Sequence, residues 1–161
     1  MNEENELTEN GTEGGGGRTG VIVVGVDGSE HSLAALRWAA EEARLRGCTL
    51  RLVAVFKSPL MTTGYEMMAP DPTDLHNATD SLLDAAVASV RAEGLLEHLE
   101  VEAEVLDGHA AERLIVCSEA ADLLVVGSRG HGGFVGVLLG SVTTYCVNHA
   151  KCPVVVVRSR S

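Results

Sequence analysis

Aromatic side chains are scarce in this sequence, which has two phenylalanines, two tyrosines and one tryptophan among 161 residues. Proteins that bind single-stranded nucleic acids commonly stack the bases on several aromatic side chains, so the composition argues against that class. Apolar residues nevertheless make up 45% of the chain. The core must therefore be built from Val, Leu, Ile and Ala, a mixture that suits a parallel sheet covered by helices.

Positive charge is also scarce, because 12 lysines and arginines stand against 23 aspartates and glutamates and leave a formal net charge of −11. Residues 1–20 carry five glutamates and one arginine, a contribution of −4, which leaves −7 for the rest of the chain. Nucleic acid backbones and anionic membranes repel such an acidic chain. We therefore expect neither as a partner, and a polyanionic ligand such as a nucleotide needs a local binding device.

Long apolar runs and paired cysteines are missing as well. No run reaches the roughly 18 apolar residues of a membrane span, and the N-terminus lacks the apolar segment of a secretory signal, so we expect a cytoplasmic protein. The four cysteines, Cys48, Cys117, Cys146 and Cys152, form no C-x-x-C pair. We expect reduced thiols and, because the histidines are scattered too, no metal site.

The composition divides the chain into a tail and one domain. Residues 1–19 are acidic and rich in glycine, and we expect them to be disordered because they hold little apolar surface to bury. Residues 20–158 form the expected domain, and 159–161 a short C-terminal tail. A GxGxxG string at 15–20 matches the dinucleotide-binding fingerprint, but it precedes a strand instead of following one, so we reject it.

Apolar and helical segments alternate along the expected domain. Strands are predicted over 21–26, 50–56, 99–106, 122–126 and 153–157, and helices over 29–46, 73–93, 110–121 and 141–149. The segment 99–106 alternates apolar and acidic residues, which favours an edge strand. The alternation of strands and helices predicts a doubly wound α/β fold with an open, five-stranded parallel sheet and helices on both faces.

Residues 127–142 form a glycine-rich loop between the fourth predicted strand and the last helix. Glycines allow main-chain N–H groups to converge on an anion, and a helix start adds unpaired donors and a partial positive charge. We therefore predict a phosphate-binding loop. Ser141 is expected to be the N-cap of the last helix and to reach a phosphate or a phosphate-bound Mg²⁺.

Three blocks of sequence, at 22–29, at 121–130 and at 140–142 with 149–157, together resemble the universal stress protein family. The spacing Gly127-x2-Gly130-x9-Gly140-Ser141 is similar to the ATP-binding signature of that family. The resemblance covers about residues 20–158 and implies a Rossmann-like sheet of the adenine nucleotide alpha hydrolase type, ordered 3-2-1-4-5. It also implies a homodimer that pairs the fifth strands, here Val154–Val157. The sequence departs from the family at Ala110, where a proline is usual.

The resemblance further implies which residues hold the nucleotide. Asp27 and the main chain at Val55 are expected at the adenosine end, and the loop and the start of the last helix at the phosphates. The expected ligand-binding residues are Gly25, Asp27, Val55, Gly127, Ser128, Arg129, Gly130, His131, Gly132, Gly133, Gly140, Ser141 and Val142. Simpler roles stay open: Asp27 could cap the turn after the first strand, and Arg129 and His131 could be solvated surface side chains.

Three functions are compatible with these patterns. The first is an ATP-binding, dimeric sensor or regulator of the stress response. The second is a slow ATP hydrolase, although the loop has no lysine, no Walker A string occurs and no catalytic residue is evident. The third is an interaction module that binds no nucleotide, against which the intact glycine spacing argues.

Overall fold

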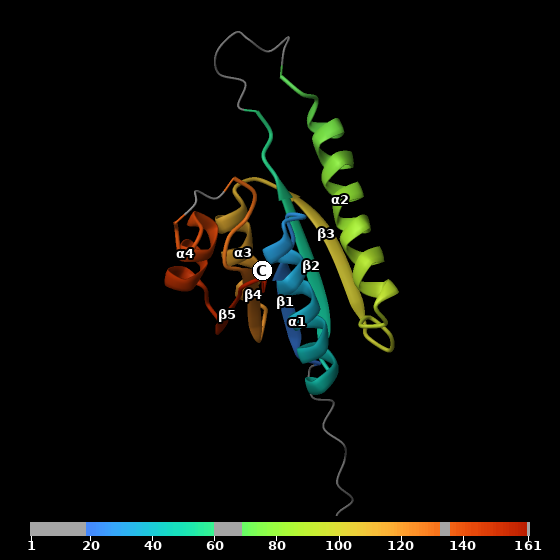
Figure 1. The fold of residues 1–161 in the computed structure, drawn as a ribbon. Coiled ribbons are helices and arrows are strands. Elements are labelled where there is room, and N and C mark those ends of the chain that lie inside the picture. Colours follow the sequence, from blue (N-terminus) through green and yellow to red (C-terminus); the bar gives the residue numbers. More distant parts are fainter. Residues whose placement is uncertain (1–18, 60–68, 133–135, 161) are drawn as a thin grey trace, which may run out of the picture.

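The computed structural model describes residues 19–59, 69–132 and 136–160. A five-stranded parallel sheet in the order β3-β2-β1-β4-β5 forms its centre (Figure 1). The strands are β1 (Val21–Gly25), β2 (Thr49–Phe56), β3 (Val101–Asp107), β4 (Leu123–Gly127) and β5 (Val154–Val157). The helices are α1 (Glu30–Arg46), α2 (Pro72–Ala92), α3 (Ala110–Ser118) and α4 (Ser141–His149). The predicted fold class and strand order are confirmed.

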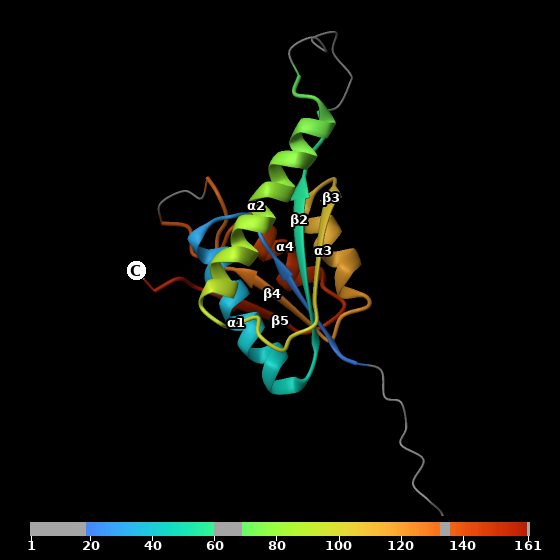
Figure 2. The same ribbon diagram turned by 90° about the vertical axis from the view of Figure 1, so that its right-hand side faces the viewer.

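Successive residues of the central strands face opposite sides of the sheet and build two cores. Ile22 and Val24 of β1 pack under α1 and α2 with Leu36 and Leu83. Val23, between them, packs with residues of the α3 and α4 layer on the other side. Figure 2 shows α1 and α2 on one side of the sheet and α3 on the other. The near-continuous aliphatic strands predicted from sequence are therefore explained by burial on both faces.

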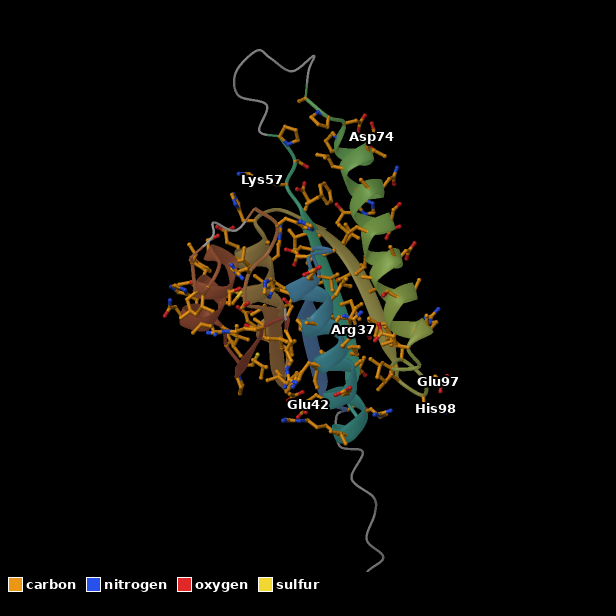
Figure 3. The ribbon with its side chains drawn as sticks, in the orientation of Figure 1. Arg37, Glu42, Lys57, Asp74, Glu97 and His98 are labelled. Carbon is orange, nitrogen blue, oxygen red and sulfur yellow. The ribbon has the colours of Figure 1, made fainter. Side chains whose placement is uncertain are left out.

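Helix α1 has a capping residue at each end. Ser29 is the N-cap, and its hydroxyl oxygen accepts a hydrogen bond from the main-chain N–H of Ser32 at 3.2 Å. Gly47 ends the helix in the left-handed conformation, with φ +64°, which costs a glycine little because it has no Cβ. Arg37 of α1, labelled in Figure 3, forms an ion pair with Glu93 at 2.8 Å, which ties α1 to the end of α2.

Helix α4 spans the predicted residues 141–149, but its N-cap lies one residue before the predicted one. Gly140 is the N-cap, with extended main chain, and Ser141 is the first helical residue. The reason is that the Gly140 carbonyl already accepts the first helical hydrogen bond, from Thr144 N–H at 2.9 Å. The prediction that Ser141 caps the helix is therefore wrong, and the Ser141 side chain, which is exposed, is not needed for that purpose.

The edges of the sheet agree with the predicted strand order. β3 and β5 are the two edges of the sheet. All four cysteines are free thiols, and burial raises the pKa of the Cys146 thiol to about 11. No helix in the described ranges is long and apolar enough to cross a membrane. Within those same ranges, no three His, Cys, Asp or Glu side chains are grouped so that they could hold a metal ion.

Candidate functional site

A cavity of about 480 Å³ lies where the carboxyl ends of β1, β2 and β4 meet the starts of α3 and α4. Between β1 and β4 the order of the sheet reverses, which is the position where open α/β sheets bind ligands. The volume is within the range of small-molecule and cofactor sites. The predicted residues in its wall are Gly25, Asp27, Val55, Gly127, Arg129, Gly130, His131, Gly132, Gly140, Ser141 and Val142.

One described residue of the predicted set, Ser128, is not in this wall. Ser128 is buried beside the cavity, with 2% of its surface exposed, and its side chain contacts His31 of α1 instead. Gly133 lies outside the described residues. The structure thus gathers the predicted residues from the ends of three strands, one loop and the start of one helix around one cavity.

Several wall residues were missed by sequence reasoning. Val53 precedes Val55 by two residues on β2, so strand periodicity places both on the same face. Ala110 and Leu114 are four residues apart on α3 and therefore share one side of that helix. These spacings could have indicated the three residues from the sequence. The remaining missed residues are Val26, Ser32, Val126, Val137 and Thr143.

Asp27, which follows β1, holds two turns of the main chain together. Its Oδ1 accepts hydrogen bonds from the N–H of Ser29 at 2.9 Å and from the Ser29 hydroxyl at 2.5 Å. Its Oδ2 accepts a longer bond, 3.3 Å, from the N–H of His131. Partial burial raises the pKa of Asp27, but the hydrogen bonds from Ser29, Ser32 and His131 outweigh it and leave the pKa below its usual value. Asp27 is therefore an ionised acceptor.

Two glycines of the loop are required by contacts within the protein. A Cβ on Gly130 would fall on Oδ2 of Asp27. A Cβ on Gly127 would lie 2.7 Å from the main-chain carbonyl carbon of His31, where α1 packs on the end of β4. Gly132 has φ +81°, a conformation that other residues rarely adopt. The glycines are therefore needed for the conformation and packing of the loop itself. The space beside the loop, which a ligand could occupy, is a consequence of that conformation.

The first residues of the loop are anchored to two neighbouring elements. The N–H of Ser128 donates to Val157 O at 2.7 Å, and its carbonyl oxygen accepts from Gly140 N–H at 2.8 Å. The buried hydroxyl of Thr143 donates to Gly127 O at 2.7 Å. These bonds fix the start of α4 directly beside the end of β4.

The start of α4 faces the cavity without a capping side chain from the described parts of the chain. Gly140 has no side chain to offer, and Ser141, Val142 and Thr143 supply the first N–H groups of the helix. All of these residues are in the cavity wall. The first N–H groups of a helix have no partner within the helix and carry the positive end of its dipole. This wall can therefore receive an anion.

The rest of the wall combines an apolar surface with charged groups. Val53 and Val55 of β2 and Leu114 of α3 offer aliphatic surface suited to a flat aromatic ring. Arg129 and His131 bring basic side chains, which can lie against an anion. A ligand with an apolar ring at one end and negative charge at the other matches these features.

An open parallel α/β sheet with its cavity at the point of strand reversal defines a Rossmann-like protein with a cavity at the usual ligand position of that fold. More narrowly, the chain belongs to the Universal stress protein family, whose sequence model matches residues 19–158.

The chain is similar to curated and solved proteins of that family. It is 37% identical over 141 residues to a universal stress protein of Mycobacterium tuberculosis, a match that covers 86% of this chain and 48% of the relative. The chain thus spans about half the length of the curated relatives it matches.

Two solved structures resemble it in fold and carry adenine nucleotides. A universal stress protein in complex with cAMP has a TM-score of 0.64 and 26% identity, with 88% of this chain and 98% of the other covered. The universal stress protein from Archaeoglobus fulgidus in complex with dAMP has a TM-score of 0.59 and 25% identity, with 86% and 97% covered.

Proposed function

We propose that this protein binds ATP in the cavity between β1, β4 and the start of α4, and acts as a dimeric sensor or regulator in a stress response. The observation that carries the proposal is the start of α4, which has no capping side chain among the described residues and opens into the cavity beside the glycine loop. The cAMP and dAMP complexes of two related structures support an adenine nucleotide as the ligand.

The residues of the cavity fit each part of ATP. Val53, Val55 and Leu114 provide the apolar surface for adenine, and Asp27 is an ionised acceptor for ribose hydroxyls or the amino edge of the ring. The N–H groups at the start of α4 and the side chain of Arg129 receive the phosphates. Mg²⁺, where it accompanies ATP, would neutralise phosphate charge and be held by the phosphates, with the exposed hydroxyl of Ser141 within the same wall.

Binding without turnover is the form of this proposal that the site supports best. Asp27 is the one carboxylate in the described part of the wall. Its pKa lies below the usual value and hydrogen bonds occupy both oxygens. A general base works best with a pKa near the operating pH, so Asp27 is poorly suited to activate water.

Equilibrium titration with a fluorescent ATP analogue tests the proposal. We expect saturable binding with a dissociation constant well below about 1 mM, competed by unlabelled ATP. Gly130→Val should abolish binding, because its side chain would collide with Asp27 and distort the loop. Gly94→Ala, at a left-handed glycine far from the cavity wall, is the matched control for losing a glycine. Absence of saturation by the unmodified protein at about 1 mM would remove the proposal.

The second part of the proposal is a homodimer through β5. β5 is an edge of the sheet and consists of four valines that are each half-buried. An apolar edge strand offers its outward N–H and C=O groups to a strand of another chain. Two copies related by a two-fold axis would then join their sheets into one.

A further inference from the structure

The side chain of His31, in the first turn of α1, lies at a junction of three segments that are distant in sequence. Its Nδ1 atom is 3.1 Å from the main-chain nitrogen of Ser159 and 3.2 Å from the hydroxyl oxygens of both Ser128 and Ser159. Ser128 begins the loop after β4, and Ser159 follows the end of β5. His31, Ser128 and Ser159 are not in the cavity wall, so they do not belong to the ligand contacts described above.

The contacts determine what His31 does at this junction. A main-chain N–H can only donate, so the bond from Ser159 requires Nδ1 to be the acceptor and the ring proton to be on Nε2. The hydroxyls of Ser128 and Ser159 can rotate to suit this arrangement. The Cβ that Gly127 lacks would strike the main chain of His31, so the whole residue is pressed against the end of β4.

Ser128 connects this junction to the cavity. It is buried, its main chain bonds to Val157 of β5 and to Gly140 at the start of α4, and the next two residues, Arg129 and Gly130, are in the cavity wall. A shift of Ser128 would therefore also move Arg129 and Gly130 in the cavity wall.

We propose that His31 is a positioning residue for nucleotide binding. By accepting a hydrogen bond from Ser159 and contacting Ser128, it clamps the start of the loop to the segment that follows β5. It thereby sets the place of Arg129 in the cavity and couples the site to the edge strand. This inference rests on the proposed binding of ATP.

Two substitutions of His31 test the clamp. His31→Asn keeps an acceptor oxygen near the position of Nδ1, and His31→Leu keeps bulk but removes the acceptor. We expect His31→Leu to weaken binding of the fluorescent ATP analogue about tenfold, the loss of one partly buried hydrogen bond, and His31→Asn to restore most of the affinity. Equal affinity of the Leu variant and the unmodified protein would overturn the inference while leaving the proposed function intact. Absence of binding by the unmodified protein would overturn both.

A second pair of variants acts on the partner of His31. Ser159→Pro removes the N–H that donates to Nδ1, and Ser159→Ala keeps it while removing only the hydroxyl. We expect the Pro variant to weaken nucleotide binding as His31→Leu does, and the Ala variant to bind nearly as well as the unmodified protein. Nitrogen NMR of labelled histidine should show Nδ1 of His31 unprotonated and Nε2 protonated at mildly alkaline pH. A protonated Nδ1, or full affinity of Ser159→Pro, would overturn the inference.

Discussion

Asp27 and Gly130 work as a pair, although they lie 103 positions apart, Asp27 after β1 and Gly130 in the loop after β4. The carboxylate accepts hydrogen bonds from the N–H of Ser29 in its own turn and from the N–H of His131 in the loop after the neighbouring strand β4. Because Oδ2 occupies the place of a Cβ at residue 130, only glycine lets the loop approach so closely. The turn role and the proposed ligand role of Asp27 are therefore compatible, since a carboxylate oxygen has two lone pairs.

A double-mutant cycle measures this pairing. Gly130→Ala should weaken nucleotide binding by about tenfold or more, because the added methyl group displaces either Asp27 or the loop. In an Asp27→Ala background the same change should cost much less, since the colliding oxygen is gone. Isothermal titration of the four proteins gives the coupling free energy. Additive effects would show that the contact between Gly130 and Asp27 is irrelevant to the site.

The lowered pKa of Asp27 makes a part of the folding stability depend on pH. A carboxyl whose pKa is lower in the folded state stabilises the protein above its unfolded pKa, about 3.9. This contribution is lost as the pH falls through the folded value. Urea unfolding should therefore show the unmodified protein to be more stable than Asp27→Asn at neutral pH. The difference should shrink as the pH falls below about 4, and a difference that is constant over this range would contradict the assignment.

At the scale of elements, the placement of α4 depends on Thr143. Its hydroxyl is the donor to Gly127 O, and 4% of the residue is exposed. The bond connects the first turn of α4 to the last residue of β4. The Thr143 side chain thus fixes the position of the start of α4, on which the proposed phosphate contacts depend.

Replacing Thr143 by Val tests this connection, because Val keeps the shape and loses the donor. The carbonyl of Gly127 would lose its side-chain partner in a buried place, and we expect a loss of about 1–3 kcal/mol in the free energy of unfolding together with weaker nucleotide binding. Thr144→Val is the control: Thr144 is exposed, and its hydroxyl bonds only to the local Gly140 O at 2.9 Å. Equal effects of the two changes in urea unfolding would argue against a special role for Thr143.

Most of the elements could be predicted because their signals are local. Continuous aliphatic runs marked the buried strands, and the helix predicted over 29–46 agrees with α1 to within one residue. The helix expected over 110–121 ends at Ser118, because the spacing of apolar residues does not mark the last residue of a helix. The N-cap of α4 was assigned to Ser141 because serine is a common cap, whereas the main-chain bond from Thr144 to Gly140 makes Gly140 the cap.

The site could be predicted only in part, for a physical reason. The glycine spacing indicated the loop, but the contacts of Gly127 and Ser128 with His31 join residues almost a hundred positions apart. Such contacts follow from the way α1 packs on β4, which no local pattern records. The prediction therefore included Ser128 as a ligand contact and missed its bond to α1.

For the whole molecule, the free edge of the sheet is the feature that bears on assembly. Leu124 N–H bonds to Pro153 O and Ser128 N–H bonds to Val157 O. Because successive residues of a strand alternate in direction, the N–H and C=O groups of Val154 and Val156 point away from β4. These are the groups that a second copy would meet in the proposed dimer.

Val156→Pro removes one outward N–H and leaves the bonds to β4 in place, since proline is tolerated on an edge strand. We expect sedimentation equilibrium to show a large shift from dimer to monomer in this variant. Val156→Ala, which keeps the N–H, should remain mostly dimeric. A Pro variant that associates as strongly as the unmodified protein would place the dimer interface elsewhere.

The most direct measurement of the central claim is an amide NMR titration of the labelled protein with magnesium and ATP. The account predicts that the largest saturable shifts fall on the N–H signals of Arg129 to Gly132 and of Ser141 to Thr143, the main-chain donors around the cavity. Shifts confined to other elements, or no saturation at about 1 mM ATP, would contradict it.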